Sequence, residues 1–228
     1  MADASSGNRV SVTHLILVPS IITLAVTILR LVGELNHWSN FWFNREAGGG
    51  FAPIGIGWLA PVFGIYFAFK LARRGEGTSS AGRVILSCVV AILLIVVAAF
   101  LTSKFISPQP DNAASIAVLL VATVAAILIM SRPWPSLFRT LIVYGYAARI
   151  PVAIVMLFAI RGNWGTHYDV KPSPDFPDMS WFMKWLLIGA APQLILWILI
   201  TVTSGLLFGG IAIAIFHREK QSAQAAHA

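Results

Sequence analysis

Charge and cysteine are both scarce in this chain. Only 11% of its 228 residues are Asp, Glu, Lys or Arg, and 57% are hydrophobic, whereas soluble domains carry about 25% charged residues. Cys88 is the single cysteine, which excludes an internal disulfide and a cysteine-ligated zinc cluster. This composition excludes an ordinary soluble domain and indicates a protein that lies in a lipid bilayer.

Common catalytic and metal-binding sequence motifs are absent as well. There is no HExxH pair, no GxSxG nucleophile elbow and no paired carboxylate motif inside an apolar run. No cofactor or metal is expected, and the only plausible acid–base groups for an enzyme are Glu34, Glu46, His37 and His167. Although the formal net charge is +7, no Lys/Arg run is interleaved with aromatic residues, so we expect no nucleic-acid partner.

Long apolar runs are the dominant feature that is present. About six of them approach the ~20 residues that a helix needs to cross the hydrocarbon core. We therefore predict an all-α, polytopic integral membrane helical bundle, with residues 1–217 as one transmembrane domain and 218–228 as a polar C-terminal tail. The expected spans lie near 11–34, 51–70, 83–104, 113–131, 139–161 and 192–217.

The last apolar run is too long for a single crossing. Residues 185–216 are almost continuously apolar, and as one helix they would extend about 48 Å. Proline suits the first turn of a helix, so Pro192 is the expected start of the last span. Residues 179–190 are then predicted to form a short helix at the membrane interface.

Basic residues indicate the orientation. Lys and Arg are more frequent in the termini and in the 70–83 and 132–139 segments than in the 35–50, 104–112 and 161–184 segments. Because cytoplasmic segments carry the excess of basic residues, we expect both termini to be cytoplasmic, in what we take to be a prokaryotic cytoplasmic membrane.

A polar stripe runs along the first expected span. At about 100° per residue its members fall on one face of a helix whose other sides are apolar. This face should point away from lipid. Near its outer end two charged residues lie four apart and can form an ion pair. The stripe consists of Thr13, Ser20, Thr23, Thr27, Arg30 and Glu34.

Arg149 is the strongest single anomaly, because it lies in the middle of the fifth expected span. Its Cα is about 15 Å from either end of that span, a depth at which insertion of an arginine costs about 2.5–3.5 kcal/mol. Pro151 follows, and Tyr146 lies one turn earlier and is expected to bond the guanidinium. Three partners for Arg149 are open: Glu34, backbone carbonyls freed near Pro151, or a bound anion.

Two further segments contribute candidate residues. Gln193 and Thr201 belong to a polar stripe on the last expected span, which also contains Trp197 and Ser204. The 44–50 segment carries Arg45, Gly48, Gly49 and Gly50, and exposed amides in such a turn can hold an anion or a lipid headgroup. The expected ligand-binding residues are therefore Arg149, Arg30, Glu34, Thr27, Tyr146, Gln193 and Thr201, with the 44–50 segment as a weaker headgroup site.

Three functions follow from these features, in descending order of support. The first is binding or carriage of a small anion or an anionic lipid headgroup around Arg149. The second is an accessory or scaffold subunit, in which the polar stripes join helices to a membrane-protein partner or to another copy of the chain. The third is a membrane-embedded enzyme, in which histidine and carboxylate side chains would converge.

Overall fold

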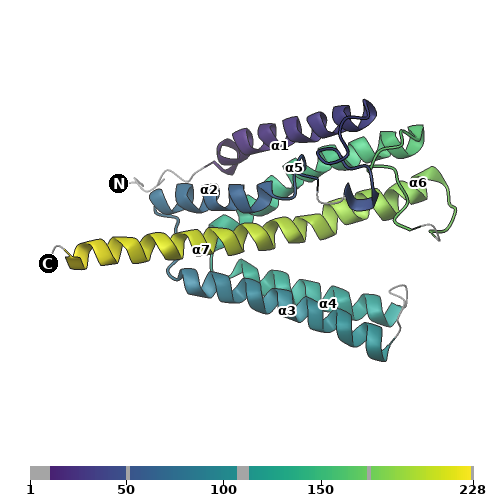
Figure 1. Cartoon of the computed structure of the whole chain (residues 1–228). Coiled ribbons are helices and arrows are strands. Elements are labelled where there is room, and N and C mark those ends of the chain that lie inside the picture. The colour runs from purple at the N-terminus through teal and green to yellow at the C-terminus, as the bar shows by residue number, and fades with distance from the viewer. Residues whose placement is uncertain (1–10, 50–51, 107–112, 174–175, 227–228) are drawn as a thin grey trace, which may run out of the picture. The chain divides into compact units, whose positions relative to one another are not determined.

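The computed structural model describes residues 11–49, 52–106, 113–173 and 176–226, with side chains up to Phe216. All regular secondary structure in these residues is helical (Figure 1). Five helices are long and apolar enough to cross a membrane: α1 (Val12–Leu35), α3 (Ala81–Phe105), α4 (Ala113–Ser131), α5 (Pro135–Gly162) and the run Trp181–Phe216. The prediction of an all-α membrane helical bundle is confirmed.

The second expected span differs from its prediction. Helix α2 (Leu59–Arg73) has 15 residues and begins eight residues after the expected start at 51. Residues 52–58 are not helical, because Pro53, Gly55 and Gly57 disfavour a helix interior. A Cβ added at Gly55 would lie 2.9 Å from a guanidinium nitrogen of Arg30, so glycine also permits a close approach of this segment to α1.

The expected break at Pro192 is not present. The chain is helical from α6 (Trp181–Lys184) through η2 (Trp185–Ala190) and η3 (Pro192–Leu196) into α7 (Trp197–Ala226). The two η segments have the wider π-helical turn, in which an N–H bonds the carbonyl five residues earlier. The amide of Trp197 bonds the carbonyl of Pro192 in this way. The wider turns accommodate the proline, so 179–190 is not separated from the last span, and α7 continues past the expected end at 217.

The chain divides into two compact units, and the boundaries fall inside helices. Unit 1 comprises Met1–Ala60 and Ile142–Val202, and unit 2 comprises Pro61–Leu141 and Thr203–Ala228. Helices α5 and α7 therefore each contribute one part to each unit.

In unit 2, α3 and α4 lie side by side as an antiparallel pair (Figure 1). Helix α2 meets the second part of α7 through glycine, since a Cβ added at Gly64 would overlap the backbone of Gly205. Leu137 and Leu141, from the first part of α5, are fully buried. Small residues at such crossings let helix backbones approach closely.

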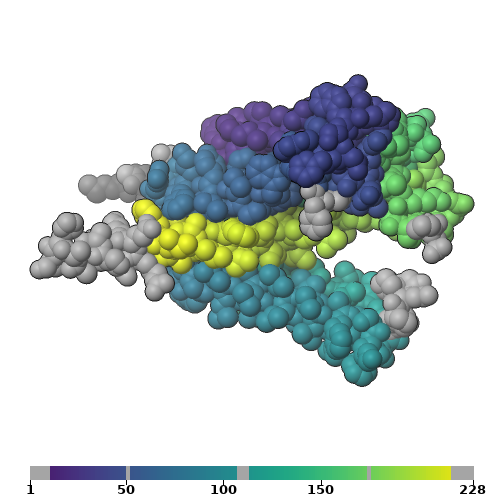
Figure 2. Space-filling view, viewed as in Figure 1, coloured from purple at the N-terminus to yellow at the C-terminus, as the bar shows by residue number. Residues whose placement is uncertain are grey.

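In unit 1, α1 lies along α5 (Figure 1). The hydroxyls of Thr23 and Tyr144 are 2.8 Å apart and join the two helices. Thr23, Thr27, Arg30 and Glu34 are all buried, so the inward orientation predicted for this part of the stripe is confirmed. The segments 36–49, 163–173 and 176–180, which follow α1 and α5, gather at the same end of unit 1 (Figure 2).

Candidate functional site

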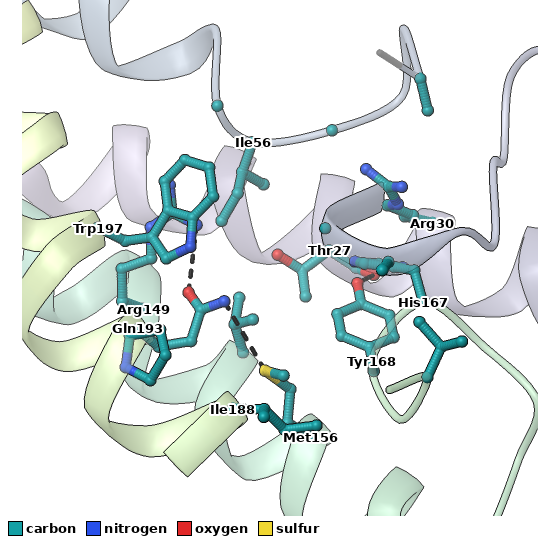
Figure 3. A pocket seen from close by; sticks show the side chains of 18 of the residues that line it. Thr27, Arg30, Ile56, Arg149, Met156, His167, Tyr168, Ile188, Gln193 and Trp197 are labelled. Carbon is teal, nitrogen blue, oxygen red and sulfur yellow. Dashed lines mark hydrogen bonds between the residues drawn. The ribbon is translucent and has the colours of Figure 1, made fainter. Parts of the chain in front are cut away.

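A pocket of about 900 Å³ lies within unit 1. Figure 3 shows Arg149, Gln193 and Trp197 on one side of it and Thr27, Arg30, His167 and Tyr168 on the other. The non-helical residues 52–58 also contribute to the wall. The pocket is therefore built by α1, α5, the last helical run and the two connecting segments.

Arg149 is buried in the pocket wall, with only 5% of its surface exposed. Its Nη1 donates to the side-chain oxygen of Gln193 over 3.2 Å. Its guanidinium carbon lies 4.4 Å from the ring centroid of Trp197, a cation–π contact. Its Nε is buried and has no hydrogen-bond partner among the described residues. A buried donor without a partner is costly, so the protein itself satisfies this guanidinium only in part.

No Asp or Glu is found among the described residues that line the pocket, although Arg30, Arg149 and His167 all are. The described part of the chain also contains no ion pair to Arg149. Of the three partners predicted for Arg149, Glu34 instead pairs with Arg30 and His167. The side-chain oxygen of Gln193 and the ring of Trp197 contact the guanidinium in place of the expected backbone carbonyls. The pocket is therefore electropositive around a guanidinium that remains uncompensated.

Apolar side chains make up much of the remaining wall. Ile56, Val152, Met156 and Ile188 line the pocket together with Trp58. A hydrophobic wall with a few convergent polar groups is typical of small-molecule sites. An anion that fits here would carry an apolar body as well as its charge.

Glu34 is the centre of a second polar cluster at the pocket edge, and its side chain is fully buried. Arg30 Nε lies 2.8 Å from Glu34 Oε1, so the predicted i,i+4 pair is formed. The backbone amide of His167 donates to Glu34 Oε2 over 2.9 Å. His167 Nδ1 lies 2.5 Å from Glu34 Oε1, across a sequence separation of 133 residues.

Arg30 also holds the segment after α1. Its Nη2 donates to the carbonyl of Asn44 over 3.0 Å and to that of Gly49 over 2.8 Å. Gly49 has φ +75°, and a Cβ there would overlap the guanidinium, so only glycine fits. Arg30 is thereby neutralised by Glu34, which leaves Arg149 as the arginine of the pocket without a carboxylate partner among the described residues.

The segment that carries His167 is folded by Asp169. Its carboxylate accepts the amides of Gly165 and Thr166 and the hydroxyl of Thr166. Lys184 donates to the backbone carbonyl of Asp169 over 2.7 Å. Burial lowers the pKa of His167 below its ordinary value, and the hydrogen bond to Glu34 acts in the opposite direction. Burial also raises the pKa of Tyr168, so this phenol is protonated.

Several predicted residues lie elsewhere. Tyr146 is 41% exposed and does not line the pocket, so the prediction that it bonds Arg149 is wrong. Successive residues differ by about 100° around a helix, which places Tyr146 about 200° from the buried Tyr144. Thr201 is buried and donates to the carbonyl of Trp197, but it does not line the pocket.

The glycine segment is arranged differently from its prediction. Arg45 contacts His37 rather than the pocket. The amide of Gly49 donates to the carbonyl of Glu46 over 2.8 Å, so it is used within the turn. Gly48 lines the pocket, and Gly50 lies outside the described residues.

Trp197, His167 and Tyr168 line the pocket but were not among the predicted binding residues. Trp197 follows Gln193 by four residues, and this spacing on one helix face was the available signal. His167 was named only as an acid–base candidate, and Tyr168 had no signal at all. No protein-family model, curated protein or solved structure matches this chain.

Proposed function

We propose that this is a multi-pass membrane protein that binds, and in the simplest extension carries, an organic anion in the unit 1 pocket. The observation that supports the proposal is Arg149: a buried guanidinium with an unpartnered Nε, in a pocket wall whose described residues include no acid. Buried charges in proteins are normally paired. An oxyanion of a ligand in the pocket would supply the missing counter-charge beside the guanidinium.

The ligand chemistry follows from the wall. One negative oxyanion group would meet Arg149 and the Gln193 amide, and an apolar body would meet Trp58, Trp197 and Met156. A soluble amphiphilic anion and an anionic lipid share this chemistry. A test must therefore separate these two sources.

The first test compares two probes that differ mainly in charge. Naphthalenesulfonate is anionic, and naphthalenesulfonamide is a neutral molecule of similar shape. In neutral detergent we expect saturable binding of the sulfonate by calorimetry and at least about tenfold weaker binding of the sulfonamide, because a hydrogen bond to a charged group contributes about 1.5–3 kcal/mol. Equal affinities for the two probes would contradict the proposal.

Two additions complete this experiment. Arg74→Met is the control for overall charge, since Arg74 is exposed and outside the pocket, and it should leave sulfonate binding unchanged. Competition in nanodiscs with and without phosphatidylglycerol identifies the source of the natural ligand. Displacement of the sulfonate by this lipid points to a headgroup, and unchanged binding points to a soluble anion.

We also propose that both termini are cytoplasmic. The support is the excess of Lys and Arg in the 70–83 and 132–139 segments and at the ends of the chain. A cysteine at Ser79 should be labelled by an impermeant maleimide only from the cytoplasmic side, and one at Ser173 only from outside. The buried native Cys88 supplies the background measurement, and reversed labelling at both sites would overturn this orientation.

An enzymatic function is the second candidate, and the contact between Glu34 and His167 favours it. A carboxylate that orients an imidazole is a common arrangement for general base catalysis. The two functions differ in one readout. Mass spectrometry should recover a bound ligand chemically unchanged from a binding protein, whereas an enzyme would convert that ligand on incubation.

A further inference from the structure

His167 lies in an arrangement that fixes which of its ring nitrogens titrates. Glu34 accepts from Arg30 Nε and from the His167 backbone amide, and a carboxyl group that receives donors on both oxygens is a carboxylate. A carboxylate only accepts hydrogen bonds. His167 Nδ1, 2.5 Å from Glu34 Oε1, therefore carries a proton, and Nε2 is the nitrogen that gains or loses one.

This nitrogen belongs to the pocket rather than to the cluster. His167 is one of the lining residues, and the described part of the chain shows hydrogen bonds only from its Nδ1 and its backbone amide. Nε2 is also not among the buried atoms without a partner. The titrating site of this histidine is thus open to what the pocket contains.

The charged and titratable groups around His167 come from four elements. From α1 there are Glu34 and Arg30, which neutralise each other. Its own segment supplies Tyr168 and Asp169, and α6 supplies Lys184, which bonds the Asp169 carbonyl. On α5, Arg149 is the remaining cation of the pocket. With a neutral imidazole the empty pocket already has one uncompensated positive charge, and protonation of His167 would add a second.

An anion changes this balance. When the pocket is empty, burial lowers the pKa of His167 more than the hydrogen bond to Glu34 raises it, so the imidazole is neutral near pH 7. A bound anion supplies negative charge in the same pocket and favours the imidazolium. With one anion and one proton bound, the pocket carries a single uncompensated positive charge, the same as when it is empty.

We propose that His167 is the proton-binding residue of this pocket, so that one anion and one proton are taken up together. The inference rests on the anion-binding function proposed above and adds a coupled ion to it. In a membrane this coupling would link the occupancy of the pocket to the proton gradient.

The sign of the pH dependence follows from linkage. Binding an anion raises the pKa of His167, so between the pKa of the empty protein and that of the complex each ligand binds with one proton. The dissociation constant for the anion then falls about tenfold for each unit by which the pH falls. Above and below this window the affinity becomes constant, with the tighter plateau at low pH.

The experiment uses naphthalenesulfonate, whose charge does not change in the range examined. Titrations of the full chain in neutral detergent are run from about pH 5 to pH 8, where histidine changes charge. We expect the affinity of the wild type to rise toward low pH by at least about tenfold in total. His167→Gln should bind with the alkaline affinity of the wild type at every pH, and His37→Gln, at an exposed residue outside the pocket, should keep the full dependence.

Calorimetry in buffers of different ionisation enthalpy gives an independent readout that needs no variant. The wild type should take up close to one proton per sulfonate inside the window. Zero proton uptake, or the same pH slope in His167→Gln as in the wild type, would overturn the role of His167 while leaving anion binding established. Absence of sulfonate binding at every pH would instead refute the proposed function itself.

Discussion

Glu34→Gln should lower the free energy of unfolding by about 3–5 kcal/mol, the cost of removing one partner from a buried ion pair. The Glu34 side chain is fully buried and that of Arg30 is 10% exposed. The substitution keeps the shape and removes the charge, so the Arg30 guanidinium is left buried without a counter-ion. The amide NH₂ of glutamine would also face the donors of Arg30 or of His167.

The consequences should reach beyond α1. Arg30 donates to the carbonyls of Asn44 and Gly49, and Glu34 holds the His167 segment. Both segments that follow α1 and α5 therefore depend on one carboxylate. We expect limited proteolysis in the 36–49 and 163–173 segments to accelerate in Glu34→Gln before the helices themselves unfold.

Two controls accompany the melting experiment. Asp178→Asn removes another ion pair, with Lys171, but the Asp178 carboxylate is almost fully exposed and its loss should change stability little. Combining Glu34→Gln with Arg30→Met should cost much less than the sum of the single variants, because the two charges are coupled. Similar melting temperatures for Glu34→Gln and Asp178→Asn would refute a structural role for the cluster.

Local periodicity explains what could be predicted. The stripe on α1 has the spacing of one helix face, and Thr23, Thr27, Arg30 and Glu34 are buried as that spacing requires. The ion pair between Arg30 and Glu34 is equally local, since it joins residues four apart. Information of this kind is contained in a single stretch of sequence.

The helix boundaries at Pro192 and at the start of α2 could not be predicted from local sequence periodicity. Pro192 was expected to begin a new helix, but the wider π-helical turns accommodate its missing N–H within one continuous helical run. Gly55 lies outside α2 beside the Arg30 guanidinium, a contact made by a different element. In both places the outcome depends on geometry that local propensity does not contain.

The pairing of Glu34 with His167 depends on tertiary structure alone. The two residues are separated by 133 positions, and neither stripe nor spacing connects them. Arg149 could be recognised as anomalous from its depth, but its partner Gln193 and its contact with Trp197 come from another helix. Sequence therefore indicated which side chains required partners, and the fold determined which partners they met.

Arg149 distinguishes binding from structure most directly, because its removal should change binding and stability in different directions. Arg149→Met retains an apolar side chain of similar length and removes the buried charge. Relief of the desolvation cost, several kcal/mol for a buried ion, opposes the loss of one charged hydrogen bond worth about 1.5–3 kcal/mol and of a cation–π contact worth about 2 kcal/mol. We expect the melting temperature of the empty variant to equal or exceed that of the wild type.

Binding of the anion should respond in the opposite way. Loss of a charge-assisted contact of about 1.5–3 kcal/mol corresponds to about tenfold to a hundredfold weaker binding of naphthalenesulfonate. Arg149→Lys should recover only part of this affinity, because lysine keeps the charge but lacks the planar fork of donors and the stacking on Trp197. The informative measurement is the pair of values for each variant, the melting temperature without ligand and the dissociation constant with it. A strongly destabilised Arg149→Met protein that binds the sulfonate with wild-type affinity would identify Arg149 as a structural residue, because its bonds to Gln193 and Trp197 would then be its whole role.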